Sequence, residues 1–278
     1  LAKSVARREG CDMQIGLVFG LTAIVAIVPA IMLSWRAQFR RDIAYWAVLL
    51  LACAGPLSAV ISRLDGTWQG DFATTIWVTI AATMGIFLIF AACVRGAWRL
   101  TPLVSAYMLV LGLMGLAWQH APDMPVSVSG EMGWLLLHIS FAVATYALAT
   151  LAAVAALAAF IQERALKRKQ KPMLDGVLPA ITQCDRLVVQ FLAIGEAVLA
   201  AGLLTGATLS MMAGSGPLPL DHKTIFTLGA FIIIGILLYA QIRHGVRGRR
   251  AARIVLLAYL LLTLGYPGVK FVTEVLLM

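Results

Sequence analysis

Eight long apolar stretches alternate along the chain with short polar connections. They cover residues 14–34, 43–62, 75–94, 101–118, 134–161, 187–213, 225–242 and 254–277. Apolar residues surround each predicted helix instead of forming one stripe, as lipid-facing helices require, since a bilayer offers no water to the backbone. A membrane-spanning helix needs about 20 such residues. The pattern predicts an all-α polytopic membrane protein, a bundle of about eight transmembrane helices with no sizeable soluble domain.

The composition excludes a soluble globular protein, because 61% of the 278 residues are hydrophobic and only 13% are charged. We expect a single transmembrane domain over residues 13–278. Residues 1–12 precede Met13, which stands directly before the first span and would make a clean initiator. We interpret residues 1–12 as a non-native or flexible N-terminal extension.

The net charge of +9 is chiefly a signal of orientation. Sixteen of the 22 basic residues lie in four alternate connections, 35–42, 95–100, 162–186 and 243–253. The positive-inside rule places these connections in the cytoplasm. It predicts a multi-pass protein of the bacterial inner membrane with both termini in the periplasm. Basic residues in 1–12 disagree, and the alternative is a first helix that enters with its N-terminus inside, so that the helix count is off by one.

Few polar groups interrupt the predicted spans. Glu196 stands near the middle of the sixth, while Lys270 and Glu274 are four residues apart in the last, where they share a helix face and can pair. Gly202 and Gly206 form a GxxxG spacing, which lets another helix approach closely. We interpret the lysine and glutamate as a pair that is structural or snorkels outward to the interface, and we leave the role of Glu196 open.

Three of the four histidines fall at the predicted outer face. His120 follows the fourth span, His138 lies one turn into the fifth, and His222 lies in the connection before the seventh. Imidazoles at one membrane face suit axial ligation of haem or a borderline metal. A lone buried histidine is also commonly a hydrogen-bonded structural group. The positions alone leave both interpretations open.

The sequence offers no sign of self-contained catalysis. It carries no phosphate-binding loop and no evident nucleophile with an acid and base. Its four cysteines form neither CxxC nor CxxCH, so a redox pair and covalent haem attachment are not indicated. We expect a protein that is not an enzyme, with the lipid bilayer as a partner and no nucleic acid.

Two segments resemble the cytochrome c assembly superfamily, which includes CcsA, CcmC, HemX and YpjD branches. The fifth helix, WLLLHISFAVATYALATLAAVAALAAFIQERALKRK, is similar to a family helix that opens on an outer histidine, contains a tyrosine and ends in a basic loop. The later stretch from GLLTGATLSMMAG through HGVRGRRAAR to GYPGVKFV is similar to the family's C-terminal part. The resemblance covers residues 130–278 and is strongest to the HemX and YpjD-like inner-membrane branch.

The resemblance implies a haem-handling site at the outer face. Asp221 and Lys223 occupy the Asp and Lys positions of the family's loop before the seventh helix, and His138 matches the first outer histidine. The tryptophans of that loop are missing here, and His222 stands where the CcsA branch usually has proline. We therefore expect His138 and His222 as candidate haem iron ligands. Asp221, Lys223 and Tyr146 complete the candidate binding residues, and haem b is the expected cofactor.

The function expected from this resemblance is haem binding or assistance to cytochrome maturation at the periplasmic face, with cytochrome maturation proteins as partners. An alternative is a non-haem accessory or scaffold subunit of another membrane complex, in which the GxxxG face and the basic inner loop would serve the partner. A small-solute transporter would favour inverted repeats and several mid-depth polar residues. The two halves of the sequence show no convincing repeat, and Glu196 is the only such polar residue that stands out.

Overall fold

The computed structural model describes residues 2–34, 40–63, 72–118, 132–167, 177–212, 214, 216, 221–245 and 249–268. These ranges are helical almost throughout and contain no strand, so the all-α prediction is confirmed. The helices are α1 (Ala2–Ser34), α2 (Ile43–Ile61), α3 (Phe72–Cys93), α4 (Thr101–Ala117), α5 (Met132–Lys167), α6 (Ile181–Met212), α7 (His222–His244) and α8 (Arg249–Thr263). A 3-10 turn, η1 (Ala97–Leu100), precedes α4, and a π-helical turn, η2 (Leu264–Gly268), follows α8.

Seven described helical segments are long and apolar enough to cross a membrane, namely α1, α2, α3, α5, α6, α7 and the continuous segment Ala97–Ala117, which joins η1 and α4. The polytopic prediction is therefore confirmed. α8 is not among these helices. It has only 15 residues, and its first turn contains Arg249 and Arg250. The predicted eighth span, 254–277, extends past Gly268 and so lies partly outside the described residues.

The chain divides into two compact units. Unit 1 holds α1, α2, α4 and α3 as far as Leu88, and unit 2 holds the end of α3, η1, α5 to α8 and η2. Each unit is described by itself below. The expected single domain over 13–278 stays a prediction.

Close helix packing forms the core of unit 1. Gly55 of α2 stands so near α1 that a Cβ atom there would lie 2.7 Å from the Cβ of Ala26. The Trp77 ring is fully buried, and its Cη2 atom would lie 3.6 Å from a Cβ built at Gly112 of α4. A buried hydrogen bond of 3.1 Å joins the hydroxyls of Tyr45 and Thr101. Small residues thus let the helices of this unit approach closely.

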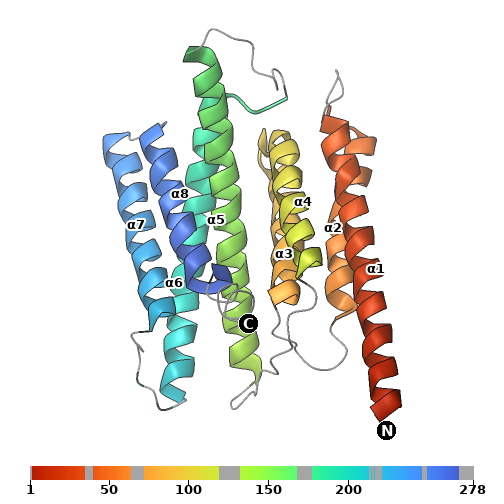
Figure 1. Cartoon of the computed structure of the whole chain (residues 1–278). Helices are drawn as coiled ribbons and strands as arrows, with labels where there is room; N and C mark the ends of the chain where they lie inside the picture. The colour runs from red at the N-terminus through yellow and green to blue at the C-terminus, as the bar shows by residue number, and fades with distance from the viewer. Residues whose placement is uncertain are drawn as a thin grey trace. The chain divides into compact units, whose positions relative to one another are not determined.

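Unit 2 is organised around α5, the long helix coloured green in Figure 1. At 1.5 Å per residue its 36 residues extend about 54 Å, well beyond the roughly 30 Å hydrocarbon core of a bilayer. Alanines buried along its middle allow α6 to pack against it. α8 packs against both α5 and α7, and η2 packs against α7. The excess length of α5 carries Arg164 and Lys167 in its last turn.

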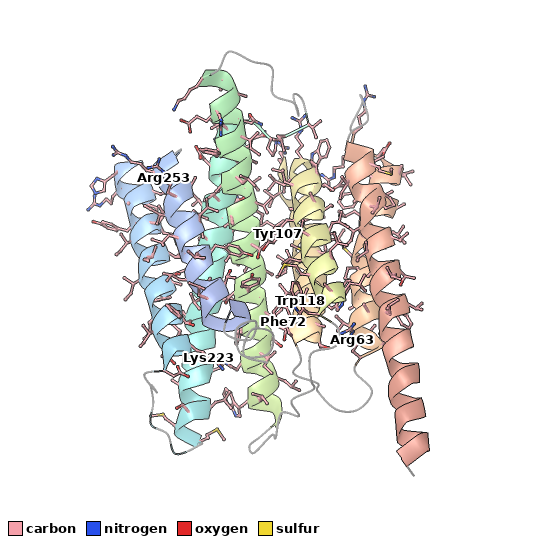
Figure 2. All side chains as sticks on the ribbon, viewed as in Figure 1. Arg63, Phe72, Tyr107, Trp118, Lys223 and Arg253 are labelled. Carbon is pink, nitrogen blue, oxygen red and sulfur yellow. The ribbon has the colours of Figure 1, made fainter. Side chains whose placement is uncertain are left out.

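Charged residues mark the two ends of unit 2. Lys223 lies at the beginning of α7 and Arg253 near the beginning of α8, at opposite ends of the unit in Figure 2. The last turn of α5, which contains Arg164, and the beginning of α6 lie at the same end of the unit as the beginning of α8 in Figure 1. Within this unit, the helix ends beside the basic connections that the sequence predicts to be cytoplasmic therefore lie at one end. The beginning of α7, which the sequence predicts to be periplasmic, lies at the other end.

Candidate functional site

His138 of α5 makes the most informative contacts among the candidate residues. Its Nδ1 atom lies 3.1 Å from the carbonyl oxygen of Gly202 and 3.2 Å from the hydroxyl of Thr205, both on α6. A carbonyl oxygen can only accept, so Nδ1 is the protonated nitrogen in this arrangement. The Thr205 hydroxyl donates to the carbonyls of Ala201 and Gly202 and offers a lone pair to the same N–H. The Nε2 atom of His138 is thereby left with its lone pair.

This arrangement is the one that metal-bound histidines usually show. The nitrogen that does not bind the metal donates to a carbonyl or carboxylate, which fixes the tautomer and the orientation of the ring. Here α6 supplies the acceptors and α5 supplies the imidazole, which is only half-buried. The site can therefore offer one neutral imidazole nitrogen, Nε2, to a metal, while hydrogen bonds at Nδ1 hold the ring in place.

The GxxxG residues of α6 form the surface beneath this imidazole. A Cβ atom at Gly206 would lie 2.9 Å from Cε1 of His138, closer than Cβ atoms approach such a ring. A Cβ atom at Gly202 would meet the Cβ of Phe141 at an ordinary 3.5 Å. Both glycines therefore face α5 of the same chain. The close approach that this spacing permits is therefore used within unit 2, between α6 and α5.

The connection before α7 is described only in part. Asp221 is the N-cap of α7, where its carboxylate accepts a 2.9 Å hydrogen bond from the backbone N–H of Thr224. Lys223 is exposed in the first turn. His222 is the first residue of α7, but its side chain and all of His120 lie outside the described residues. The pairing of His222 with His138 stays a prediction.

Tyr146 lies apart from His138, although both belong to α5. The eight positions from one to the other correspond to about 12 Å along the helix axis and about 80° around it. Tyr146 faces α8, where its hydroxyl lies 2.9 Å from that of Tyr259 and 3.4 Å from that of Thr263. The Thr150 hydroxyl lies 3.4 Å from that of Tyr259. These four residues form a hydroxyl cluster that fastens α8 to α5, a contact that the sequence did not indicate.

Two further sequence predictions fall elsewhere. Glu196 is half-buried on α6, on the side of α7, while Lys270 and Glu274 lie outside the described residues. Within the described part of the chain, no three His, Cys, Asp or Glu side chains gather to hold a metal ion. Haem iron needs only one or two axial ligands from the protein, because the macrocycle supplies the other four. A single well-held histidine is therefore a meaningful site for haem.

The family model described as cytochrome c assembly protein matches residues 43–277, most of the chain. The chain belongs to this family. The match begins well before residue 130, where the resemblance noted in the sequence began. It covers α2 to α8, including His138 and the beginning of α7.

Similar proteins span the chain almost end to end. An uncharacterised 28.8 kDa protein of Azospirillum brasilense is 45% identical over 95% of this chain and 100% of its own length. The inner membrane protein YpjD of Escherichia coli K12 is 26% identical over 92% of this chain and 98% of its own. The cytochrome c biogenesis protein CcsA of Parasynechococcus marenigrum is 22% identical over 93% of each chain. No solved structure matches the chain.

The family membership confirms the resemblance drawn from the fifth helix and the C-terminal stretch, including a YpjD-like relative. The similarity to an inner membrane protein also agrees with the described helices, which make the chain a polytopic membrane protein.

Proposed function

We propose that this protein binds haem at the periplasmic face of the inner membrane and acts in cytochrome c biogenesis, with Nε2 of His138 as an iron ligand. The hydrogen bond from Nδ1 of His138 to the Gly202 carbonyl is the observation that carries the proposal. It holds the ring and leaves Nε2 as the metal-binding nitrogen. The similarity to CcsA, a cytochrome c biogenesis protein, supports the role in biogenesis.

Other residues of unit 2 complete the proposed site. His222 is the candidate second iron ligand. Lys223, exposed beside it, offers a cation to a haem propionate. Asp221 would act by fixing the beginning of α7, since its carboxylate already caps that helix. Tyr146 would act at a distance, by fastening α8 against α5.

Haem would be carried here and not chemically transformed, so we propose a binding role without catalysis. Haem b, if bound, would supply an iron centre, and the neutral imidazole of His138 would help to hold it. The chain's own contribution is to hold that imidazole in one tautomer with the hydroxyl of Thr205 and the carbonyl of Gly202.

Cells that lack this protein are expected to contain several-fold less covalently bound haem in their c-type cytochromes, because a step of haem handling is missing. Haem staining of membrane proteins measures this. The wild-type chain should restore the signal and His138→Ala should not, while Ser140→Ala, whose hydroxyl bonds only to the Leu136 carbonyl of its own helix, should behave as wild type. An unchanged cytochrome c content, together with a haem-free chain that purifies with a stoichiometric membrane partner, would instead favour the accessory-subunit alternative.

The proposed orientation predicts opposite reactivity at the two ends of unit 2. A cysteine in place of exposed Lys223 should react in intact spheroplasts with a membrane-impermeable maleimide, because the beginning of α7 faces the periplasm. A cysteine in place of exposed Arg253 should react only after the membrane is permeabilised. Mass spectrometry of the labelled chain, with the parent chain as control for its own cysteines, measures both. The reverse pattern would contradict the orientation.

A further inference from the structure

Glu196 is a carboxyl group in the middle of a membrane-spanning helix. It is the sixteenth of the 32 residues of α6, so about 22 Å of helix separates it from the first residue of α6 and about 24 Å from the last. It lies about three turns from the nearest described basic residue of its own helix, Arg186, and far from both capped ends of α7. An ionisable group at this depth is costly and calls for a functional explanation.

The side chain of Glu196 is seated against a glycine of α7. A Cβ atom at Gly235 would lie 3.2 Å from Oε1 of Glu196, so the missing side chain makes room for the carboxyl group. The Oε2 atom is buried and has no hydrogen-bond partner among the described residues. The surrounding residues on the two helices are hydrocarbon, with Leu192 and Leu199 buried on α6 and Ile234 buried on α7.

Among the described residues, no charged or titratable group acts on Glu196 closely enough to compensate a charge there. On α7, Tyr239 is four residues beyond Gly235 and its side chain is exposed. α5 packs against a different face of α6. The residue that contacts Gly195 there is Leu148, which is apolar. No salt bridge among the described residues includes Glu196. A carboxylate in this seat would be an uncompensated charge in hydrocarbon, whereas the neutral acid costs far less.

We propose that Glu196 is a proton-binding site within the membrane, which holds its proton while the side chain is seated in the notch at Gly235. Release of the proton would leave a charge that the notch cannot accommodate. Proton loss is therefore coupled to movement of the carboxyl group away from α7. This proposal concerns α6 and α7 alone and is independent of haem binding at His138.

A hydrophobic carbodiimide such as dicyclohexylcarbodiimide tests for such a group. The proton of the acid moves to one nitrogen of the reagent while the carboxyl oxygen bonds to its central carbon. The acyl group then shifts to the other nitrogen and leaves a stable N-acylurea, with no group lost. Only the protonated acid reacts in this way, and the reagent reaches it through the lipid.

The experiment uses the full chain in lipid nanodiscs and locates the adduct by peptide mass spectrometry. Glu196 should be labelled at pH 7, where an ordinary exposed glutamate is protonated in only about one molecule in 500. The labelling rate should fall about tenfold per pH unit once the carboxyl ionises. Glu196→Gln should lose the adduct. Glu163, which is paired with Lys167 at the end of α5, should instead react with a water-soluble carbodiimide.

Glutamine reproduces the shape of the neutral acid, so Glu196→Gln should keep the thermal unfolding midpoint within about 2 °C of wild type. Two results would overturn the proposal. One is the absence of the adduct at Glu196 from pH 5 to pH 8. The other is a loss of stability in the Gln variant together with loss of a co-purifying membrane protein, which would mean that a cationic partner neutralises an ionised Glu196.

Discussion

Replacing His138 with alanine is expected to abolish the haem absorption of the purified protein. The change removes the one described imidazole nitrogen whose protonation state is fixed for metal binding. The fold should survive, because the Thr205 hydroxyl and the Gly202 carbonyl keep the hydrogen bond they make within α6. The height of the Soret band per chain is the measurement, with the unfolding midpoint of the apoprotein measured alongside.

Two matched variants separate ligation from structure. Thr205→Val keeps the volume of the side chain but removes an acceptor for the Nδ1 proton, and loss of such a contact weakens metal binding about tenfold or more. Ser140→Ala removes an exposed hydroxyl two residues from His138 and should leave haem affinity unchanged. A His138→Ala protein that keeps the full Soret band would exclude His138 as the iron ligand.

Gly206→Leu is expected to produce the second large effect, by displacing the imidazole from its seat. Even a Cβ atom at Gly206 would lie 2.9 Å from Cε1 of His138, so a leucine must push the ring away or separate α5 from α6. Overpacking of this kind costs about 1–3 kcal/mol of unfolding free energy. Haem binding should be lost as in His138→Ala, with a lowered unfolding midpoint in addition.

Gly202→Ala is the matched control within the same GxxxG spacing. Its Cβ would meet Phe141 at an ordinary 3.5 Å, and alanine favours a helix over glycine by about 0.5–1 kcal/mol. We expect this variant to bind haem and to unfold at or above the wild-type temperature. If Gly206→Leu binds haem as wild type does, the seat described for His138 does not determine binding.

The fold could be predicted largely from the sequence because apolar length is a direct signal of a membrane span. Helix ends were predicted less well. α6 begins at Ile181, six residues before the predicted start, since Asp185 and Arg186 end the apolar run without ending the helix. α7 begins at His222, three residues before the predicted start, because Asp221 caps it there. A helix end depends on backbone hydrogen bonding, whereas a span depends on hydropathy.

The candidate site was predictable only in part, because a helix that is apolar on all sides does not reveal its neighbours. His138 was identified from its place near one membrane face. The hydrogen bond to Gly202 joins residues 64 positions apart, and the Tyr146 to Tyr259 contact spans 113 positions. Neither has a periodic signal in the sequence. The GxxxG spacing predicted a close helix approach correctly, but not that its partner is α5.

The absorption spectrum of the purified wild-type chain, expressed with a haem precursor, tests the central claim most directly. Haem bound through a neutral imidazole predicts a Soret band and about one iron atom per chain, with reduced α and β bands typical of a histidine-ligated b haem. Both features should disappear in His138→Ala. A colourless wild-type protein that is folded, membrane-inserted and free of iron would contradict the proposal that this member of the family binds haem.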